Sequence, residues 1–483
     1  MPETPHFGTD GWRGIIAEDF TFAAVRQVSQ AIALELRELV RRTEGGDTRP
    51  PGLVIGYDTR FGSGRFAAAA AEVFVAHDIH VYLCRTPTPS QVVSHAIVDL
   101  RADGGIMITA SHNPAQFNGI KLKGRSGAPA SVDFLRSLEA RLVVLEGLGE
   151  LPPRRPLDAA EDDGNLDRIA PIAKYVAALR GLVDLEPVRN AGMTIVADAM
   201  YGAAAGILPS LFNEATTKLI EINGAANPFF PNLRGPEPIA ANLTRLSRLV
   251  QEGNSTLGVA FDADGDRLGV VGQDGKYISA QTIFALLTLY LLEVRGWSGP
   301  IVKSMNGTTM VDLLAQDFGV PVYETPVGFG AVAPLLRQHD AIIGGEETGG
   351  FGFRHHVPER DGILSALFLL DLLAQRGGTI DEAIADLEAR VGEWFYERLD
   401  LPCRLEQGAG VIERVRAAAP RRLAGVPIAR MLDEDGIKYV LEDGSWLLIR
   451  CSGTEPVLRL YAEAHSPERV QELLTRGREL SGL

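Results

Sequence analysis

Along most of this chain, an apolar strand pattern leads into a glycine-containing turn and then into a helical pattern. The clearest copies of this unit cover residues 53–76, 192–211 and 301–318. Strands and helices that alternate at such spacing form mostly parallel sheets with helices on their faces. The copies share a shape rather than a sequence repeat. We therefore expect an α/β fold with three similar mixed α/β domains.

The end of the chain has a different pattern, in which short alternating strands at 438–441 and 445–450 precede a helix after Ser466. That pattern is typical of a smaller, C-terminal α+β domain. A length of 483 residues also exceeds what one core supports. The candidate linkers are a proline-rich and then acidic stretch at 151–167 and the region after 381–390. We expect four domains, at residues 1–155, 165–277, 278–388 and 389–483.

Composition narrows the class of protein. With 46% apolar and 23% charged residues, the chain can bury several cores. A net charge of −15 argues against nucleic acid as a partner, and the apolar stretches are too short to span a membrane. Cys84, Cys403 and Cys451 are too widely spaced for a disulfide framework or a cysteine metal site. The first residues lack the basic and apolar blocks of a signal peptide, so we expect a cytoplasmic protein. We expect its partner to be a small molecule, and the sequence leaves its oligomeric state open.

The stretch Thr109-Ala-Ser-His-Asn-Pro114 follows the apolar run 104–108, which has the pattern of a buried strand. Its Asn-Pro ending favours a turn. A serine on a tight turn at a strand end presents its hydroxyl as a nucleophile or a phosphate carrier. Ser111 is therefore a candidate reactive residue, and an ordinary polar turn is the alternative.

A second apolar run, 257–261, leads directly into Asp262, Asp264 and Asp266. Alternate residues of an extended chain face the same way, so three carboxylates converge. Such a cluster of like charges suits a hard cation, and Mg²⁺ is the candidate. A calcium-binding EF-hand loop is disfavoured, because its sixth and twelfth positions would be Arg267 and Gln273. A solvated acidic turn remains the other alternative.

Three further loops carry groups that suit a phosphorylated sugar. In the glycine-dense loop 7–14, Arg13 can clamp an anion. In the loop that follows 341–345, Glu346 and Thr348 are expected to be exposed and to accept hydrogen bonds from sugar hydroxyls. The loop near the C-terminus offers phosphate donors: a guanidinium, two hydroxyls and backbone amides, from Arg450, Ser452, Gly453 and Thr454. The alternatives are an ordinary turn, a helix N-terminus with capping acids and a hairpin turn, respectively.

Lysine is scarce in this chain, which has 40 arginines and seven lysines. A lysine suits a position where a cation must also give up a proton. Lys121, Lys123 and Lys303 are the candidates. For any one of them, compositional drift is the alternative.

Taken in order, these motifs resemble the α-D-phosphohexomutase superfamily, and most closely its phosphoglucomutase/phosphomannomutase members. The similarity runs from Phe7 to Pro456. It implies four domains around a central cleft, the last of which closes over the substrate. The motifs are Gly-Thr-Asp-Gly-Trp-Arg-Gly, Thr-Ala-Ser-His-Asn-Pro, Asp-Ala-Asp-Gly-Asp-Arg, Gly-Glu-Glu-Thr-Gly-Gly and Arg-Cys-Ser-Gly-Thr-Glu-Pro.

The resemblance also implies a role for each residue. Ser111 would carry a phosphoryl group, with Mg²⁺ bridging it to the three aspartates. Lys121 would be the general acid and base, because arginine does not deprotonate. The remaining catalytic residues would be Arg13, Arg267 and His112, while Glu346 and Thr348 would hold the sugar and Arg450, Ser452, Gly453 and Thr454 would hold the phosphate that does not react.

In the implied reaction, the phosphoryl group of Ser111 passes to the free hydroxyl of a hexose phosphate. The resulting hexose 1,6-bisphosphate turns end for end and returns its other phosphate to the serine. Some relatives have a histidine where this chain has Gly350, and the Glu-Glu-Thr-Gly-Gly form resembles glucose-phosphate enzymes. We expect glucose phosphates as substrates, with mannose phosphates second.

Two alternatives remain open. The opening Gly-Thr-Asp-Gly is also similar to phosphoglucosamine mutases. A strand that ends in Asp262-Ala-Asp264 could instead belong to an aspartyl-phosphate phosphatase, which would release inorganic phosphate and leave Ser111 without a role. A sugar-phosphate binder without catalysis is disfavoured, because the serine, the lysine and all three aspartates are present.

Overall fold

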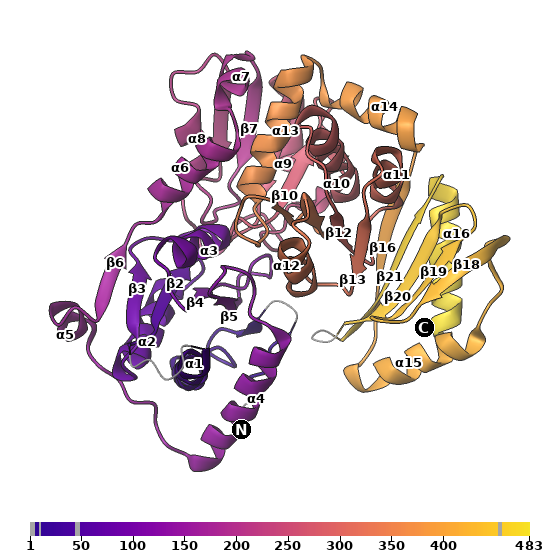
Figure 1. Ribbon diagram of the computed structural model, residues 1–483. Helices are drawn as coiled ribbons and strands as arrows, with labels where there is room; N and C mark the ends of the chain where they lie inside the picture. Colours follow the sequence, from indigo (N-terminus) through magenta and orange to yellow (C-terminus); the bar gives the residue numbers. More distant parts are fainter. Residues whose placement is uncertain (1–4, 9–10, 44–48, 453–455) are drawn as a thin grey trace.

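The computed structural model describes residues 5–8, 11–43, 49–452 and 456–483. Its described strands form four sheets, which follow one another along the chain. Figure 1 shows three helix-covered units in succession and a fourth, mostly sheet, beside the third. The expected fold class, three mixed α/β domains and a smaller C-terminal one, is confirmed.

The first sheet has the order β1-β5-β4-β2-β3-β6. The four neighbouring strands β4, β2, β3 and β6 run parallel to one another. Residues 166–169 fall inside the range expected for the second domain, yet they extend this sheet as the parallel neighbour of β3. The elements are β1 (Trp12–Ile15), α1 (Phe22–Thr43), β2 (Gly52–Tyr57), α2 (Ser63–Ala76), β3 (His80–Cys84), α3 (Ser90–Asp99), β4 (Gly104–Ile108), β5 (Phe117–Gly124), α4 (Val132–Leu148), α5 (Leu157–Asp162) and β6 (Leu166–Ile169).

The second sheet has the order β11-β10-β9-β7-β8. The helical pattern expected over 202–211 is shorter in the structure, where α8 begins only at Ile207 because Gly206 before it is in a left-handed conformation with φ of 77°. The elements are α6 (Ile172–Leu182), α7 (Leu185–Asn190), β7 (Thr194–Asp198), α8 (Ile207–Leu211), β8 (Lys218–Ile222), η1 (Ala240–Asn242), α9 (Thr244–Glu252), β9 (Leu257–Phe261), β10 (Leu268–Val271) and β11 (Tyr277–Ile278).

The third sheet has the order β13-β12-β14-β15. One apolar core runs from the second sheet into the third, and α13 lies inside it with residues 362–373 buried on every side. The elements are α10 (Ala280–Leu289), the π-helical turn η2 (Tyr290–Val294), β12 (Ile301–Ser304), α11 (Thr309–Phe318), β13 (Val322–Thr325), α12 (Phe329–Gln338), β14 (Ile343–Gly345), β15 (Phe351–Phe353), α13 (Gly362–Arg376) and α14 (Ile380–Val391).

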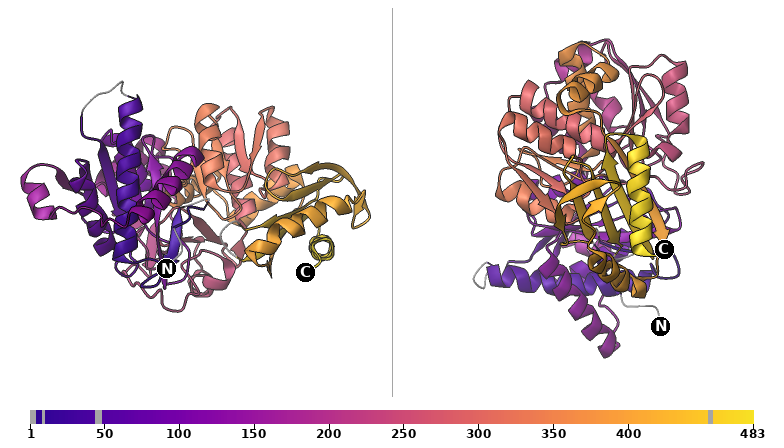
Figure 2. Two further views of the ribbon diagram at one scale, coloured as in Figure 1. Left: turned by 90° about the horizontal axis from the view of Figure 1, so that it is seen from below. Right: turned by 90° about the vertical axis from the view of Figure 1, so that its right-hand side faces the viewer.

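The fourth sheet is antiparallel, in the order β16-β21-β20-β19-β18-β17. Helices α15 and α16 pack on one face, and Figure 2 shows α16 lying along the sheet. The other face meets the third domain, where Trp446 and Tyr461 pack against Met305. The elements are β16 (Phe395–Pro402), α15 (Leu405–Ala418), β17 (Arg422–Leu423), β18 (Val426–Leu432), β19 (Ile437–Leu441), β20 (Trp446–Cys451), β21 (Val457–Ala464) and α16 (Pro467–Ser481).

Local sequence sets several of the helix ends. A capping box formed by Thr379 and Glu382 begins α14. Ser466 caps α16, which Pro467 opens and Gly482 ends in a left-handed conformation. These residues satisfy backbone groups that a helix terminus otherwise leaves without partners.

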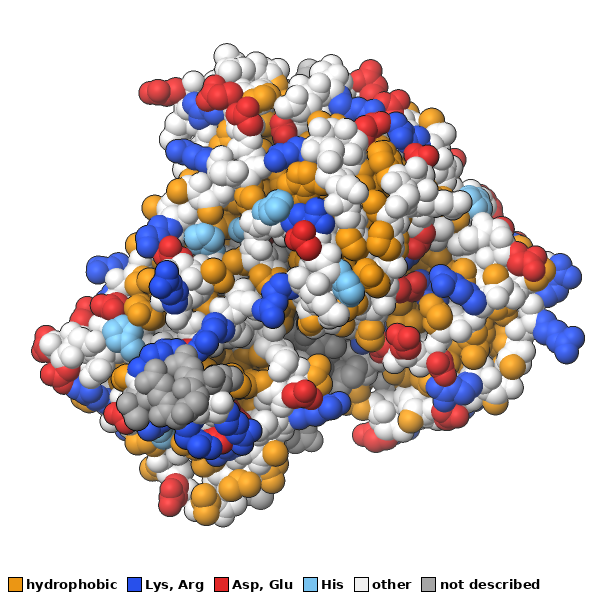
Figure 3. Space-filling view, viewed as in Figure 1, with side chains coloured by type: hydrophobic (Ala, Val, Ile, Leu, Met, Phe, Trp, Pro, Cys, Tyr) orange, Lys and Arg blue, Asp and Glu red, His pale blue; other side chains and the backbone are white. Residues whose placement is uncertain are grey.

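The four domains leave a notch between the first and the fourth, at the lower edge of the space-filling view in Figure 3. No single helix of the described residues is both long and apolar enough to cross a membrane, although α13 and α14, bent by 88°, meet that test as a pair.

Candidate active site

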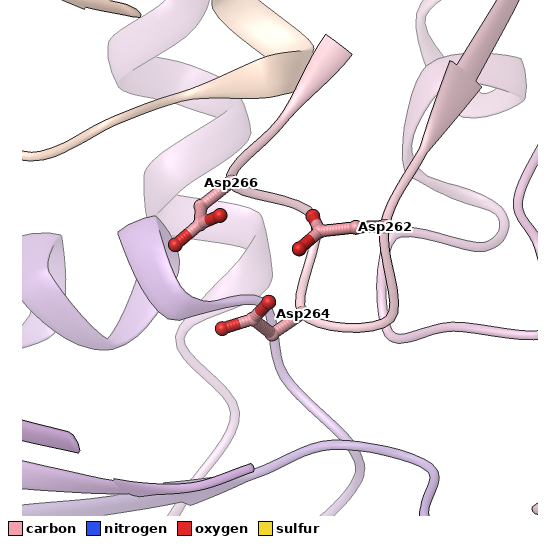
Figure 4. Close-up of side chains that lie close together, drawn as sticks. All are labelled: Asp262, Asp264 and Asp266. Atoms are coloured by element: carbon pink, nitrogen blue, oxygen red, sulfur yellow. The ribbon is translucent and has the colours of Figure 1, made fainter. Parts of the chain in front are cut away.

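The three aspartates lie on the turn between β9 and β10, and their carboxylates point toward one another (Figure 4). Each has no exposed surface, and one oxygen of each lies within 4.8 Å of the others. Burial, followed by the charges of Asp264 and Asp266, raises the pKa of Asp262 well above its ordinary value. Three buried carboxylates at this separation need a cation, and their hard oxygen atoms suit a divalent metal ion.

Ser111 lies at the end of β4, in a left-handed conformation with φ of 51°. Its side chain is buried, and its Oγ donates a hydrogen bond to Oδ2 of Asp262 at 2.7 Å. Nδ1 of His112 is 3.3 Å from the same Oγ. The structure therefore brings the serine of the first domain onto the acidic turn of the second, 151 residues further along the chain.

The three lysines that the sequence singled out have different surroundings. Nζ of Lys121, on β5, lies 2.8 Å from Oδ2 of Asp264 and 2.8 Å from Oδ2 of Asp266. Lys123, two residues along the same strand, pairs with Glu359 of the third domain at 2.5 Å. Lys303 pairs with Asp312 within the third domain. Of the three, Lys121 is the one that contacts the aspartate cluster.

The two arginines expected at the reacting centre adjoin its loops. Arg13, on β1, donates to the side-chain oxygen of Asn113, two residues beyond Ser111. The backbone N–H of Arg267 donates to Oδ1 of Asp262 at 3.1 Å, and its guanidinium lies 3.4 Å from Glu237. Both arginines thus border the space beside the serine and the acidic turn.

The loop after β14 differs from its expected exposure. Glu346 is buried rather than exposed, because its Oε2 lies 3.2 Å from a guanidinium nitrogen of Arg360. A second nitrogen of Arg360 lies 2.9 Å from Oδ2 of Asp266. Thr348 is half-buried, and its Oγ1 is enclosed without a hydrogen-bond partner among the residues that the structure describes. Arg360 therefore links the expected sugar loop to the aspartate cluster.

The sequence indicates cations in the segment 354–362, after the glycine-rich loop, but it does not assign Arg360 to the site. It also does not indicate the contacts by which the first domain holds the acidic turn. Ser90 donates its N–H to the carbonyl oxygen of Asp264 at 2.9 Å, and Nε2 of Gln91 donates to that of Gly265 at 2.8 Å. No local pattern points to these two residues.

The expected phosphate loop is described in part. Arg450, at the end of β20, is largely buried and pairs through Nε with Oδ2 of Asp435 at 2.8 Å. The N–H of Val327 donates to the same oxygen of Asp435, which joins this corner to the third domain. Ser452 is buried beside it. The expected residues Gly453 and Thr454 lie outside the described residues.

This fold, with a serine and an aspartate cluster in contact, defines the class of intramolecular phosphotransferases that act on hexose phosphates. The chain belongs to the phosphoglucomutase/phosphomannomutase family of the α-D-phosphohexomutase superfamily. The family's models of α/β/α domains I, II and III match residues 4–144, 173–275 and 279–391, and that of its C-terminal domain matches 403–479.

Similar curated proteins extend over nearly the whole chain. A protein of Thermococcus gammatolerans named "Probable phosphoglucosamine mutase" is 30% identical over 476 residues, 98% of each chain. One of the same name from Methanothermobacter thermautotrophicus is 31% identical over 477 residues, covering 98% of this chain and 96% of its own. A Thermococcus kodakarensis protein named "Phosphoglucomutase/phosphomannomutase" is 30% identical over 480 residues, 98% of each.

Solved structures agree on the architecture. A Thermus thermophilus structure, described as that of a "putative phosphomannomutase", has a TM-score of 0.83 at 31% identity, and the match covers 100% of both chains. An Aspergillus fumigatus N-acetylphosphoglucosamine mutase in complex with GlcNAc-6P and magnesium shares the fold, with a TM-score of 0.62 at 15% identity over 100% of this chain and 96% of its own. The expected superfamily is confirmed, but the preference for glucose is not, because the relatives' names favour the phosphoglucosamine mutase alternative.

Proposed function

We propose that this protein interconverts the 6-phosphate and 1-phosphate of a hexose of glucose configuration, with glucosamine phosphate as the preferred substrate. The observation that carries the proposal is the 2.7 Å hydrogen bond from Ser111 Oγ to Asp262. It supports Ser111 as the phosphoryl carrier, because the hydroxyl adjoins the cluster of charges that phosphoryl transfer requires. The names of the similar proteins support the choice of glucosamine.

In the first step, the bond between phosphorus and Ser111 Oγ breaks, and phosphorus bonds to the free sugar hydroxyl. The proton that this hydroxyl loses reaches Oγ, with Lys121 as its carrier. The second step reverses these bond changes at the other phosphate, after the hexose 1,6-bisphosphate has turned. The uncatalysed barrier to cleavage of a phosphate monoester is so high that the site must lower it by roughly 20 kcal/mol or more.

The residues fit a metal ion, because three buried carboxylates converge and the ammonium of Lys121 already lies against two of them. Asp262, Asp264 and Asp266, together with the serine oxygen, would hold Mg²⁺, which when bound supplies positive charge to the phosphoryl group in transfer. Arg13 and Arg267 add fixed charge on either side, and His112 is a further donor to the phosphate on Ser111.

Substrate binding follows from the two remaining loops. Glu346 and Thr348 would accept hydrogen bonds from sugar hydroxyls. The Oγ1 of Thr348, which has no partner within the described part of the chain, supports this assignment. Arg450, Ser452, Gly453 and Thr454 would hold the phosphate that does not react. A cradle for that phosphate is needed because the bisphosphate must stay bound while it turns.

Glucose phosphate is the second candidate substrate. The Glu-Glu-Thr-Gly-Gly form of the sugar loop favours it, as does the relative named phosphoglucomutase/phosphomannomutase. The two sugars differ at carbon 2, where glucosamine carries an ammonium in place of a hydroxyl. A coupled assay with glucosamine, glucose and mannose phosphates, compared by kcat/KM, decides between them.

The phosphoryl carrier is tested by incubation with labelled hexose 1,6-bisphosphate, followed by mass spectrometry of the modified peptide. We expect label on Ser111, no label in Ser111→Ala, and retained label in the control Ser137→Ala, whose hydroxyl on α4 binds Glu35. Release of inorganic phosphate with no label on Ser111 would instead support the aspartyl-phosphate phosphatase and refute the proposal.

A further inference from the structure

The side chain of Arg60 contacts the serine loop, residues 111–117, and has no role in the mechanism above. It follows β2 and has no exposed surface. Its Nε lies 3.1 Å from Oδ2 of Asp58, which is equally buried. The ring of Phe230, from the second domain, covers the guanidinium at 5.1 Å. The charge is therefore enclosed between two domains, with a carboxylate as its partner.

One guanidinium binds four carbonyl oxygens of the serine loop. One terminal nitrogen donates to the carbonyls of Pro114 at 2.9 Å and Phe117 at 3.0 Å. The other donates to the carbonyls of Asn113 and of Ser111 itself. A planar fork with five N–H groups can reach several acceptors at once, and a lysine ammonium, with three donors at one point, does not reproduce this geometry. The shape of the loop therefore depends on an arginine.

Asp58, the partner of Arg60, holds the N–H of Ser111 through Thr109. It accepts hydrogen bonds from the hydroxyls of Thr109 at 2.6 Å and Ser63 at 2.8 Å. The hydroxyl oxygen of Thr109 in turn accepts the N–H of Ser111 at 2.8 Å. The N–H of Ser111 is thus held through Asp58 and its carbonyl through Arg60. This matters because a left-handed φ of 51° is unfavourable for serine and persists when the surroundings impose it.

We infer that Arg60 is a positioning residue for phosphoryl transfer, which with Asp58 holds Ser111 in the left-handed conformation that directs Oγ at the aspartate cluster. The inference rests on the proposed function of Ser111. Arg60 acts through the loop backbone, so its loss should lower kcat and leave KM largely unchanged. An error of about 1 Å in the position of a reacting group can cost roughly 100-fold in rate.

The test compares Arg60→Lys with Arg189→Lys. Arg189 is a matched control, because its two terminal nitrogens also donate to backbone carbonyls, those of Leu211 at the end of α8 at 2.6 Å and of Asn213 after it at 2.7 Å, in the second domain. We expect Arg60→Lys to lower kcat by about 100-fold with KM within about threefold of wild type. Arg189→Lys should lower the melting temperature and leave kcat unchanged.

A second readout separates positioning from general stability. Guanidinium ion added to Arg60→Ala should restore part of kcat by filling the vacated site, and it should not raise the kcat of Arg189→Ala. If Arg60→Lys fails to fold, Asp58→Asn provides the same test from the other side, with a similar fall in kcat.

The outcomes distinguish this inference from the proposed function. Wild-type protein that takes no label on Ser111 refutes both. Wild-type protein that labels and turns over, together with a folded Arg60→Lys or Asp58→Asn whose kcat is within about threefold of wild type, overturns the inference alone. A fall in kcat no larger than that of Arg189→Lys also overturns it.

Discussion

The ammonium of Lys121 lies 2.8 Å from a carboxylate oxygen of Asp266, although the two residues belong to different domains. Strand register explains the position of the lysine, which lies opposite Met107 of β4, a short distance before Ser111. The aspartate is brought there by the turn after β9. A titratable cation, the reactive hydroxyl and the acidic cluster therefore share one buried site.

Two replacements of Lys121 test whether catalysis needs its positive charge alone or also its ability to transfer a proton. Lys121→Arg keeps the charge but cannot release a proton, whereas Lys121→Met loses both. We expect both variants to lose roughly 10²- to 10⁴-fold in kcat, the range for general acid and base catalysis. Lys123→Arg is the control, because Lys123 pairs with Glu359 and needs only its charge. A kcat for Lys121→Arg within about tenfold of wild type would rule out the proton role.

The local features of the site could be predicted from sequence. Ser111 and Asp262 each follow an apolar strand, and such strand ends meet where α/β sheets bind ligands. Contacts between domains could not be predicted, because they depend on how separate sheets pack. The contact of Arg360 with Asp266 and that of Gln91 with Gly265 are examples, since no local pattern specifies either partner.

Two differences from the sequence-based expectations have different origins. The helix expected over 202–211 begins only at Ile207, because Gly206 just before it is left-handed, with φ of 77°. Glu346 is buried because Arg360, 14 residues further on, lies against it. The first outcome is set by local backbone conformation and the second by a contact between two loops.

The absence of a side chain at Gly350 leaves space for Arg360. A Cβ at residue 350 would lie 2.3 Å from Cδ of Arg360 and 2.9 Å from its Cγ. Gly350→Ala should therefore displace the guanidinium from Glu346 and Asp266, with a loss of about 1–3 kcal/mol in stability and of about tenfold or more in kcat/KM.

A double-mutant cycle checks this explanation of Gly350. Because the effect acts through Arg360, Gly350→Ala should add little to the loss in kcat/KM already caused by Arg360→Ala. Gly181→Ala, on α6 with open space around residue 181, should leave activity unchanged. Additive losses in the cycle would show that Gly350 acts by another route.

The contact between the third and fourth domains should respond to pH through Lys438. Its ammonium pairs with Glu324 of the third domain, and burial, followed by the positive charge of Lys303, lowers its pKa from 10.5 to about 8. Between these values the unfolded chain holds a proton that the folded chain has released, so this group makes the protein more stable as pH rises from about 8 to 10.5. Below that range the cost of the buried charge is fully present.

Urea unfolding of wild type and Lys438→Met across this range measures the effect. The stability of wild type relative to the variant should rise with pH, by a few kcal/mol at most at about 1.4 kcal/mol per pKa unit. Lys276→Met, at an exposed position, should show no such change relative to wild type. A difference between wild type and Lys438→Met that stays constant from pH 7 to 10 would refute the shifted pKa.

Metal removal tests the aspartate cluster by stability as well as by activity. The three carboxylates are fully buried and within 4.8 Å of one another, so without metal they repel even though the ammonium of Lys121 lies beside Asp264 and Asp266. Mg²⁺ added to metal-stripped protein should raise the free energy of unfolding, by about 2.7 kcal/mol at 100 times its dissociation constant. The effect should weaken as pH falls, because burial raises the pKa of Asp262 and protons then compete with the metal.

Asp262→Asn should reverse the order of stability. Without metal, the variant has lost the carboxylate whose charge is disfavoured by burial and by the other two aspartates, so it should be at least as stable as wild type. With Mg²⁺ it has lost a ligand, so wild type should become the more stable protein. Asp274→Asn, which alters a carboxylate outside the cluster, should keep the full response to Mg²⁺. Melting temperatures with and without the metal measure this crossover, and equal responses of wild type and Asp262→Asn would show that the cluster does not hold the ion.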